Sequence, residues 1–310
     1  MDYAAQYPDD PIPSIWSIDE SVRKAELQTR VPKERKRGGS AYLLYPIHLI
    51  RKLGYIHQSA DFIGKKYIAG RTEPINIFST SYYAPFKLYQ IKRILAETSL
   101  YAIKELEALW TTYPIPNVFR IDNGLQFRGT ARAKKAIGVF LKFLLNMGVT
   151  PLFGSPSKPW TNPHVEGHNR VFNEKVWGRN FFTGLEQIDH ECEQFNRESL
   201  DLFRFRYSEL VFNGSTNGAF RYLGQSQSVN CANLETVRGK KIYFIRFVES
   251  FERTKKAHVT ILNETVRIPE KFAHQFVFVE WNLEEEWLSI YSEYQGVSTL
   301  IEKIKFRPNI

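Results

Sequence analysis

The sequence predicts an α/β core followed by a small antiparallel β-barrel. Strand and helix patterns alternate between about residues 51 and 210, and only short strand patterns follow residue 238. With 310 residues the chain is long enough for about two domains, each able to bury a core of its own. We therefore place a core at 51–215, a linker at 216–237 and the barrel at 238–310, after an N-terminal part at 1–50.

The core elements follow from the spacing of apolar residues. β-branched and aromatic residues gather in short segments that favour strands, whereas Leu100, Ile103 and Leu106 recur near the spacing of a helix. Gly148 is typical of a helix C-terminus, and Pro163 suits a first helical turn, where no N–H is needed. The expected elements are strands at 55–63, 75–83 and 86–91, a helix at 97–112, a strand at 118–121, a helix at 131–147, a strand at 149–153 and a helix from 163 to about 179.

The two ends of the chain differ from the core. Prolines punctuate residues 1–50, and the basic run at 32–39 ends in two glycines, which is typical of a flexible arm or linker. This run is either a solvated loop or an arm that contacts phosphates. At the other end, turn residues separate short strand patterns. The expected barrel strands are 241–248, 257–262, 264–268, 275–281 and 286–291.

The composition favours an anionic partner in a reducing compartment. The chain carries 42 Lys and Arg against 33 Asp and Glu, a formal net charge of +9, and nucleic acid is the commonest partner of basic proteins. Its 2 cysteines are too few for a disulfide framework or a four-cysteine zinc site. No signal peptide or membrane-spanning run is visible, so we expect a cytoplasmic protein that acts away from membranes.

Three carboxylates stand where α/β proteins place ligands. Asp61 lies in or at the end of the first strand, Asp122 ends a later strand, and Glu166 lies in the first helical turn after Pro163. Taken singly, an Asp at a strand end more often stabilises a turn, and a Glu in a first helical turn more often interacts with the helix dipole. Together, with no Cys or His partner, they suit hard ions, which predicts two Mg²⁺ or Mn²⁺ ions for an in-line phosphoryl displacement.

The residues around these carboxylates form two motifs, DNGLQF at 122–127 and PWTNPHVEGHN at 159–169. In this order they resemble the Asp-Asn-Gly-x-x-Phe and Pro-x-x-Asn-Gly-x-x-Glu-x-x-Asn blocks of bacterial insertion-sequence transposases, the branch of the DDE superfamily related to retroviral integrases. The resemblance covers about residues 50–210.

This resemblance implies a ribonuclease-H-like core, a mixed sheet of five strands with flanking helices, in which Asp61, Asp122 and Glu166 are the catalytic metal ligands. It also implies cleavage of transposon ends and transfer of the freed 3′-OH to target DNA by a homo-oligomer assembled on DNA. Three further segments are similar to family features, namely QFNR at 194–197 to the stretch after the core, FIR at 244–246 to the C-terminal DNA-binding barrel, and PSIWSI at 13–18 to a helix-turn-helix recognition helix.

Three features depart from the family pattern. Between Asp122 and Glu166 lie 43 residues, more than in the best-known pattern, and we expect a longer helix at 131–147 to hold the excess. Pro163 replaces the usual Gly, which stiffens the loop but fits a first helical turn. Too few residues precede Pro13 for a whole helix-turn-helix array, so we expect a partial one, from a truncated copy or from a second reading frame joined to an upstream one.

Other polar side chains near the triad have different expected roles. Glu174 is the strongest rival of Glu166, because it lies on nearly the same helical face, whereas Glu73 and Asp201 have no supporting context. His164 and His168 are expected to be exposed helix residues and not metal ligands, with contact of one of them with DNA as the alternative. The expected DNA-contacting residues are Asn169, Arg170, Lys175, Lys158, Arg35, Lys36 and Arg37.

Two other functions stay open at this point. The chain can be an inactive or regulatory DNA-binding remnant of a transposase, which the incomplete front end favours. It can also be a ribonuclease-H-type nuclease that cuts without joining.

Overall fold

The structure, a computed structural model, describes residues 45–129, 132–158, 161–207, 220–224, 240–251 and 256–309, besides Ser14, Ser17, Glu20 and Ser21. The chain divides into two units, Met1–Leu43 and Leu44–Ile310, and the second holds all the strands of the described residues. Most of the expected partial helix-turn-helix lies outside the described residues, as do Arg35, Lys36 and Arg37. The boundaries predicted for core, linker and barrel stay predictions.

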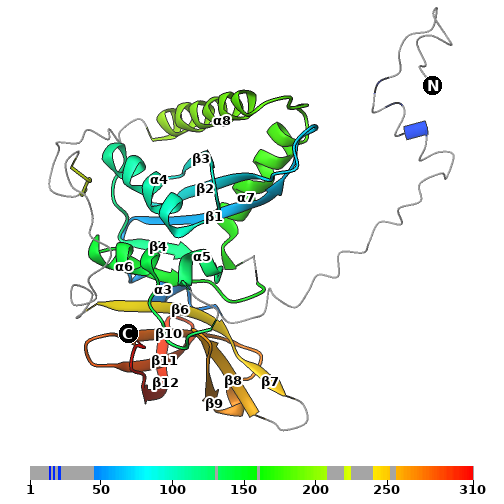
Figure 1. The fold of residues 1–310 in the computed structure, drawn as a ribbon. Helices are drawn as coiled ribbons and strands as arrows, with labels where there is room; N and C mark the ends of the chain where they lie inside the picture. The colour runs from blue at the N-terminus through cyan, green and yellow to red at the C-terminus, as the bar shows by residue number, and fades with distance from the viewer. Residues whose placement is uncertain are drawn as a thin grey trace, which may run out of the picture. The chain divides into compact units, whose positions relative to one another are not determined.

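One large mixed sheet organises the second unit (Figure 1). Among the described residues it has nine strands, in the order β12-β11-β10-β6-β5-β4-β1-β2-β3. β1, β2 and β3 pair antiparallel, whereas β4 and β5 run parallel to β1. The bounds of these five are β1 (His57–Lys66), β2 (Ile75–Ala84), β3 (Leu88–Ile94), β4 (Val118–Ile121) and β5 (Thr150–Phe153). All five predicted core strands are confirmed, with ends that shift by a few residues.

Helices cover both faces of this part of the sheet. Phe62 of β1 packs in one cluster with residues of α4 (Ser99–Thr112) and α6 (Val139–Asn146). The next residue, Ile63, packs in a second cluster with α7 (Pro163–Phe172) and α8 (Leu185–Arg206), because successive strand residues point to opposite faces. Asp61 therefore belongs to the face that α7 covers. No helix in the described part of the chain is both long and apolar enough to cross a membrane.

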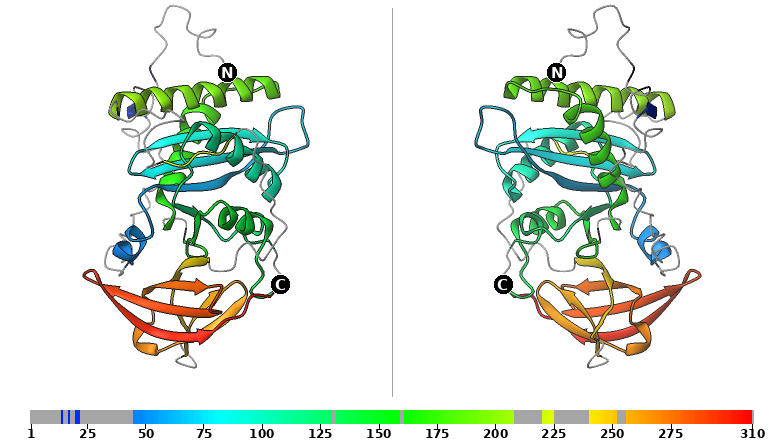
Figure 2. Two further views of the ribbon diagram at one scale, coloured as in Figure 1. Left: turned by 90° about the vertical axis from the view of Figure 1, so that its left-hand side faces the viewer. Right: turned by 90° about the vertical axis from the view of Figure 1, so that its right-hand side faces the viewer.

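α8, which the sequence analysis did not predict, lies along the edge strand β3 (Figure 2). The Asn196 side-chain amide donates to the carbonyl oxygen of Ile91 and accepts from its N–H, both at 2.8 Å. The Arg93 guanidinium pairs with the Asp189 carboxylate at 2.6 Å. An edge strand otherwise exposes unpaired backbone groups, so the segment at 194–197 completes the sheet here.

The C-terminal strands extend the core sheet, whereas a separate small barrel was expected. β6 (Lys241–Phe247) pairs parallel with β5, through Leu152 beside Tyr243 and Phe153 beside Phe244. The strand pattern of the sequence does not show which strand pairs with the free edge of β5. In the fold, β6 occupies that edge and thereby joins the C-terminal strands to the core sheet. The other bounds are β10 (Phe276–Asn282), β11 (Trp287–Tyr294) and β12 (Val297–Lys305) in the large sheet, and β7 (Glu249–Phe251), β8 (Lys256–Ile261) and β9 (Glu264–Ile268) in a three-stranded antiparallel sheet.

The expectation of a long helix at 131–147 is wrong. Helix α6 begins only at Val139, and the preceding residues turn toward the C-terminal segment. The Lys135 N–H donates to the Leu262 carbonyl at 2.9 Å, and the Asn309 N–H donates to the Lys135 carbonyl at 3.1 Å. Lys135 has a φ of 59°, which a helix does not tolerate. The residues just before α6 therefore form a turn around Lys135, which is hydrogen-bonded to Leu262 and Asn309.

In the described part of the second unit, the remaining helical elements are short. They are α3 (Ile47–Arg51), α5 (Leu125–Arg128), a π-helical turn at Asn173–Trp177 that continues α7, and a 3₁₀ turn at Glu270–Phe272. The helix expected from 163 to about 179 is therefore present, with its last part wound as a π-helix.

Candidate active site

Three acidic side chains from separate elements line one pocket of about 650 Å³, namely Asp61 of β1, Asp122 after β4 and Glu166 in the first turn of α7. Ser59 of β1 lies beside Arg120 of β4 in the parallel register. Two residues further along, Asp61 and Asp122 are therefore neighbours on the same face of the sheet. The fold brings together the three carboxylates that the motifs predicted.

Asp61 is held by two donors in an acidic environment. The Phe62 N–H donates to its Oδ1 and the Asn169 side-chain amide donates to its Oδ2, both at 2.9 Å. Burial, together with the charges of Asp122 and Glu166, raises the pKa of Asp61 to about 7. Glu97, between β3 and α4, adds a further negative charge that acts in the same direction. No motif in the sequence had singled out Glu97.

Asp122 stands at the turn that follows β4. The Gly124 N–H donates to its Oδ1 at 2.9 Å, which fixes one carboxylate oxygen. Burial raises the pKa of Asp122 in spite of this bond and of the nearby Arg128. The Asn123 side-chain amide donates to the Gly154 carbonyl at 2.8 Å and so ties the turn to the end of β5.

Glu166 is the exposed member of the three. Burial of its carboxyl group and the charge of Asp122 raise its pKa. Its rival Glu174 does not line the pocket and lies 3.9 Å from the Arg170 guanidinium. Glu73 pairs with Arg71, and Asp201 lies 3.7 Å from Arg204, both also away from the pocket.

The donor set of this pocket fits a hard divalent ion. Among the described residues, no group of three or more His, Cys, Asp or Glu side chains is arranged to hold an ion by itself. Mg²⁺ commonly takes only one or two protein carboxylates, however, and completes its shell with water and substrate phosphates. Near the carboxylates, the side-chain oxygens of Asn162 and Asn169 are buried and have no hydrogen-bond partner among the residues that the structure describes. Such amide oxygens are further ligands of the kind that hard cations accept.

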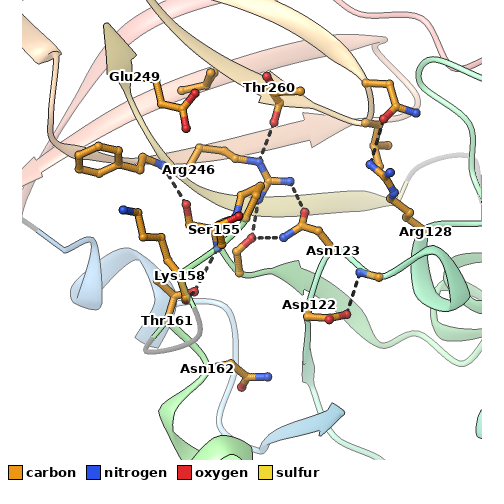
Figure 3. Close-up of a pocket in the computed structure, with 18 of the residues that line it drawn as sticks. Asp122, Asn123, Arg128, Ser155, Lys158, Thr161, Asn162, Arg246, Glu249 and Thr260 are labelled. Atoms are coloured by element: carbon orange, nitrogen blue, oxygen red, sulfur yellow. Dashed lines mark hydrogen bonds between the residues drawn. The ribbon is translucent and has the colours of Figure 1, made fainter. Parts of the chain in front are cut away.

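Arg246, a buried arginine that was not among the predicted site residues, lines the same pocket as the carboxylates (Figure 3). Arg246 of β6 is 2% exposed and donates to the carbonyls of Gly154 at 2.6 Å and Thr260 at 2.8 Å. It also donates to the Asn123 side-chain oxygen at 2.9 Å. Burial, with the nearby charge of Arg128, lowers its pKa to about 9. The only available signal was a charged residue inside an otherwise apolar strand pattern.

The residues expected to contact DNA have diverse positions. Lys158 lines the pocket, with its ammonium 4.9 Å from the centre of the Phe247 ring. Asn169 is buried and binds Asp61, whereas Arg170 and Lys175 are exposed on α7 and the turn that continues it. Their contacts with DNA stay predictions.

The expectation that His164 and His168 are exposed is wrong. His168 is 4% exposed and stacks on Tyr89 with ring centres 4.2 Å apart. His164 is partly buried and stacks on Tyr83 at 4.4 Å. The helix pattern does not show that α7 lies against β1 and β2, which covers this side of it.

The raised pKa of Asp61 predicts a pH-dependent gain in stability for Asp61→Asn. An unfolded Asp titrates near 3.8, whereas Asp61 titrates at about 7 in the fold. The folded state therefore carries a penalty that is absent below about pH 4, grows as the pH rises and is complete above about pH 7. In EDTA, thermal unfolding should show the variant more stable at pH 8, by up to roughly 4 kcal/mol, with convergence toward pH 4.

Asp201→Asn, at an exposed position, serves as the matched control and should track the unchanged protein. Added MgCl₂ should raise the unfolding temperature of the unchanged protein and leave that of Asp61→Asn nearly constant. If the difference in stability between Asp61→Asn and the unchanged protein stayed constant from pH 4 to pH 8, the raised pKa of Asp61 would be contradicted.

The comparisons with known proteins identify no family. No protein-family model matches the chain, and no curated protein matches it. Among solved structures, it is similar to a chain in the cryoEM structure of the simian T-cell lymphotropic virus intasome in complex with PP2A regulatory subunit B56 gamma. That match has 11% sequence identity and a TM-score of 0.37, and covers 79% of this chain and 75% of that chain.

Proposed function

We propose that the chain is a polynucleotidyl transferase of the transposase or integrase type, which cuts DNA ends and joins the freed 3′-OH to target DNA. The observation that supports this most is that Asp61, Asp122 and Glu166 line one pocket, where their negative charges repel one another. Oxygen-only acidic sites are typical of enzymes that use Mg²⁺ or Mn²⁺ for phosphoryl transfer. Bound there, two ions would activate the attacking oxygen and stabilise the leaving oxygen.

The chain's own residues position the carboxylates. The Phe62 N–H and Asn169 orient both oxygens of Asp61, and the Gly124 N–H orients Asp122. Arg128 and Lys158 place positive charge on the rim of the same pocket. The formal net charge of +9 favours approach of the DNA backbone, while the acidic pocket requires cations before a phosphate can enter.

Three further parts of this proposal come from the motifs and the composition. We propose DNA ends and target DNA as the partners, a homo-oligomer on DNA as the active assembly, and the cytoplasm as the compartment. Cys192 is a free, buried thiol, which suits a reducing compartment.

Substitution of two glutamates on one helix tests the assignment. Glu166→Gln should abolish Mg²⁺-dependent cleavage and joining, because it removes a pocket charge with little change of shape. Glu174→Gln is the matched control and should keep activity within a few-fold, since it affects only an exposed contact with Arg170. The assay uses labelled duplexes with the DNA that flanks the coding region, and gel analysis of nicked and joined products.

The products also separate the alternatives. Cleavage without joining would favour a ribonuclease-H-type nuclease. DNA binding with neither reaction, in both Mg²⁺ and Mn²⁺, would favour a regulatory remnant. Full activity of Glu166→Gln would exclude Glu166 as the third carboxylate.

A further inference from the structure

A second pocket, of about 590 Å³, lies on the same side of the sheet and has no role in the proposed chemistry. Five aromatic side chains contribute to its lining, with Arg120 of β4 as the buried cation. The aromatic lining residues are Tyr45, Tyr55, His57, Tyr83 and His164.

Arg120 is a buried cation without a carboxylate. It is 4% exposed, and its Nε has no hydrogen-bond partner within the part of the chain that the structure describes. Its guanidinium carbon lies 5.6 Å from the centre of the Tyr83 ring, and the Tyr45 hydroxyl is a further neighbour. Among the described residues, no Asp or Glu forms an ion pair with it. A buried charge in this condition is costly, and an anionic ligand would relieve the cost.

The rings of the aromatic wall pack against one another. Tyr83 and His164 stack with ring centres 4.4 Å apart and planes at 7°, and the His57 ring meets Tyr83 edge-on at 5.4 Å. His57 Nε2 donates to the Gly54 carbonyl at 2.8 Å, which leaves Nδ1 to accept from the Tyr83 hydroxyl at 3.3 Å. Such rings offer a flat surface on which a nucleobase stacks at little cost in conformational entropy.

The pocket adjoins the candidate active site through two elements. Arg120 lies in β4 and Asp122 directly follows that strand, two residues further along, so with extended backbone their Cα atoms lie roughly 6.6 Å apart. His164 and Glu166 likewise both belong to the first turn of α7. The separation of Arg120 and Asp122 is comparable to the spacing of successive phosphates along a DNA strand.

We propose that this pocket binds one nucleotide of the DNA strand beside the reacting phosphate, with a phosphate oxygen on Arg120 and the base against the Tyr83–His164 pair. The identity of the strand rests on the proposed function. A free nucleotide presents the same chemistry, so the experiment compares both sources.

Binding to the full-length protein is measured in EDTA, which keeps it independent of catalysis. The probes are a short single-stranded oligothymidylate, the same strand with abasic sites, thymidine monophosphate and inorganic phosphate. Arg120→Met and His164→Ala should each weaken oligothymidylate binding by roughly tenfold or more. The abasic strand should bind more weakly and should be insensitive to His164→Ala. The control Arg93→Met, which breaks an ion pair at the far edge of the sheet, should bind normally.

A thermal measurement separates binding from folding. Arg120→Met should not lower the unfolding temperature, because it removes a buried charge that has no carboxylate partner. Unchanged binding by both pocket variants, an equal loss in Arg93→Met, or binding of thymidine monophosphate without binding of the strand would overturn the proposal. If the pocket variants weaken binding while the chain neither cuts nor joins DNA, the pocket stands and the proposed function fails.

Discussion

Asp122→Asn should reduce DNA cleavage and strand transfer by at least about a thousandfold, because the ionised carboxylate contributes several kcal/mol of charge stabilisation at a metal-assisted phosphoryl transfer. The substitution preserves shape, and the Asn side-chain oxygen can still accept from the Gly124 N–H that now binds Asp122. The measurement is the rate of nicking and of joining in Mg²⁺ under single-turnover conditions.

DNA affinity distinguishes this effect from misfolding. Since the change removes a negative charge from the pocket, binding in EDTA should stay equal or become slightly tighter. Asp201→Asn is the control, because Asp201 is exposed on α8 and faces Arg204. If Asp122→Asn joined DNA strands as fast as the unchanged protein, Asp122 would not be one of the catalytic carboxylates.

Arg246→Met should lower the turnover rate more than tenfold while changing the KM for DNA little. Arg246 does not belong to the reacting groups but positions them, because it joins Asn123 and Gly154 to the C-terminal strands. Without the guanidinium, buried carbonyl oxygens lose their donors, at about 1–3 kcal/mol each, an effect partly offset by relief of the buried charge. We expect a net loss of about 2–4 kcal/mol in the free energy of unfolding.

Turnover is therefore measured at a temperature where circular dichroism shows the variant folded. Arg246→Lys should recover part of the turnover rate, since an ammonium keeps the charge but cannot reach the acceptors in Asn123, Gly154 and Thr260 at the same time. Arg221→Met is the matched control, because Arg221 also donates to backbone carbonyls, those of Met147 and Gly148, away from the pocket. A folded Arg246→Met with normal turnover would show that Arg246 serves stability alone.

The local pattern was sufficient for most elements and for the acidic residues. The strand at 118–121 was predicted with its observed ends, because a short apolar run bounded by turn residues has few other conformations. Asp122 and Glu166 could be selected because their neighbours formed two ordered motifs. Helix α8 escaped prediction since its apolar positions are few among charged ones, and β12 because its side chains are mostly exposed or half-buried.

The partners of these elements were decided by contacts between distant parts of the chain. Nothing in the pattern at 241–248 indicates that β6 pairs with β5, and this pairing carries Arg246 to the turn at Asp122. The same holds for Asn169, which helical spacing placed beside Glu166 but which α7 packing turns toward Asp61.

Residue type and spacing therefore predict which chemistry to test, because the number of oxygen ligands and the basic charge are properties of composition and order. The pKa of Asp61, the Arg120 Nε that has no partner among the described residues, and the bonds of Arg246 exist only after folding. Each of these three features depends on burial and on neighbours that are distant in the sequence. Burial and these contacts arise only when the strands and helices pack together and exclude water.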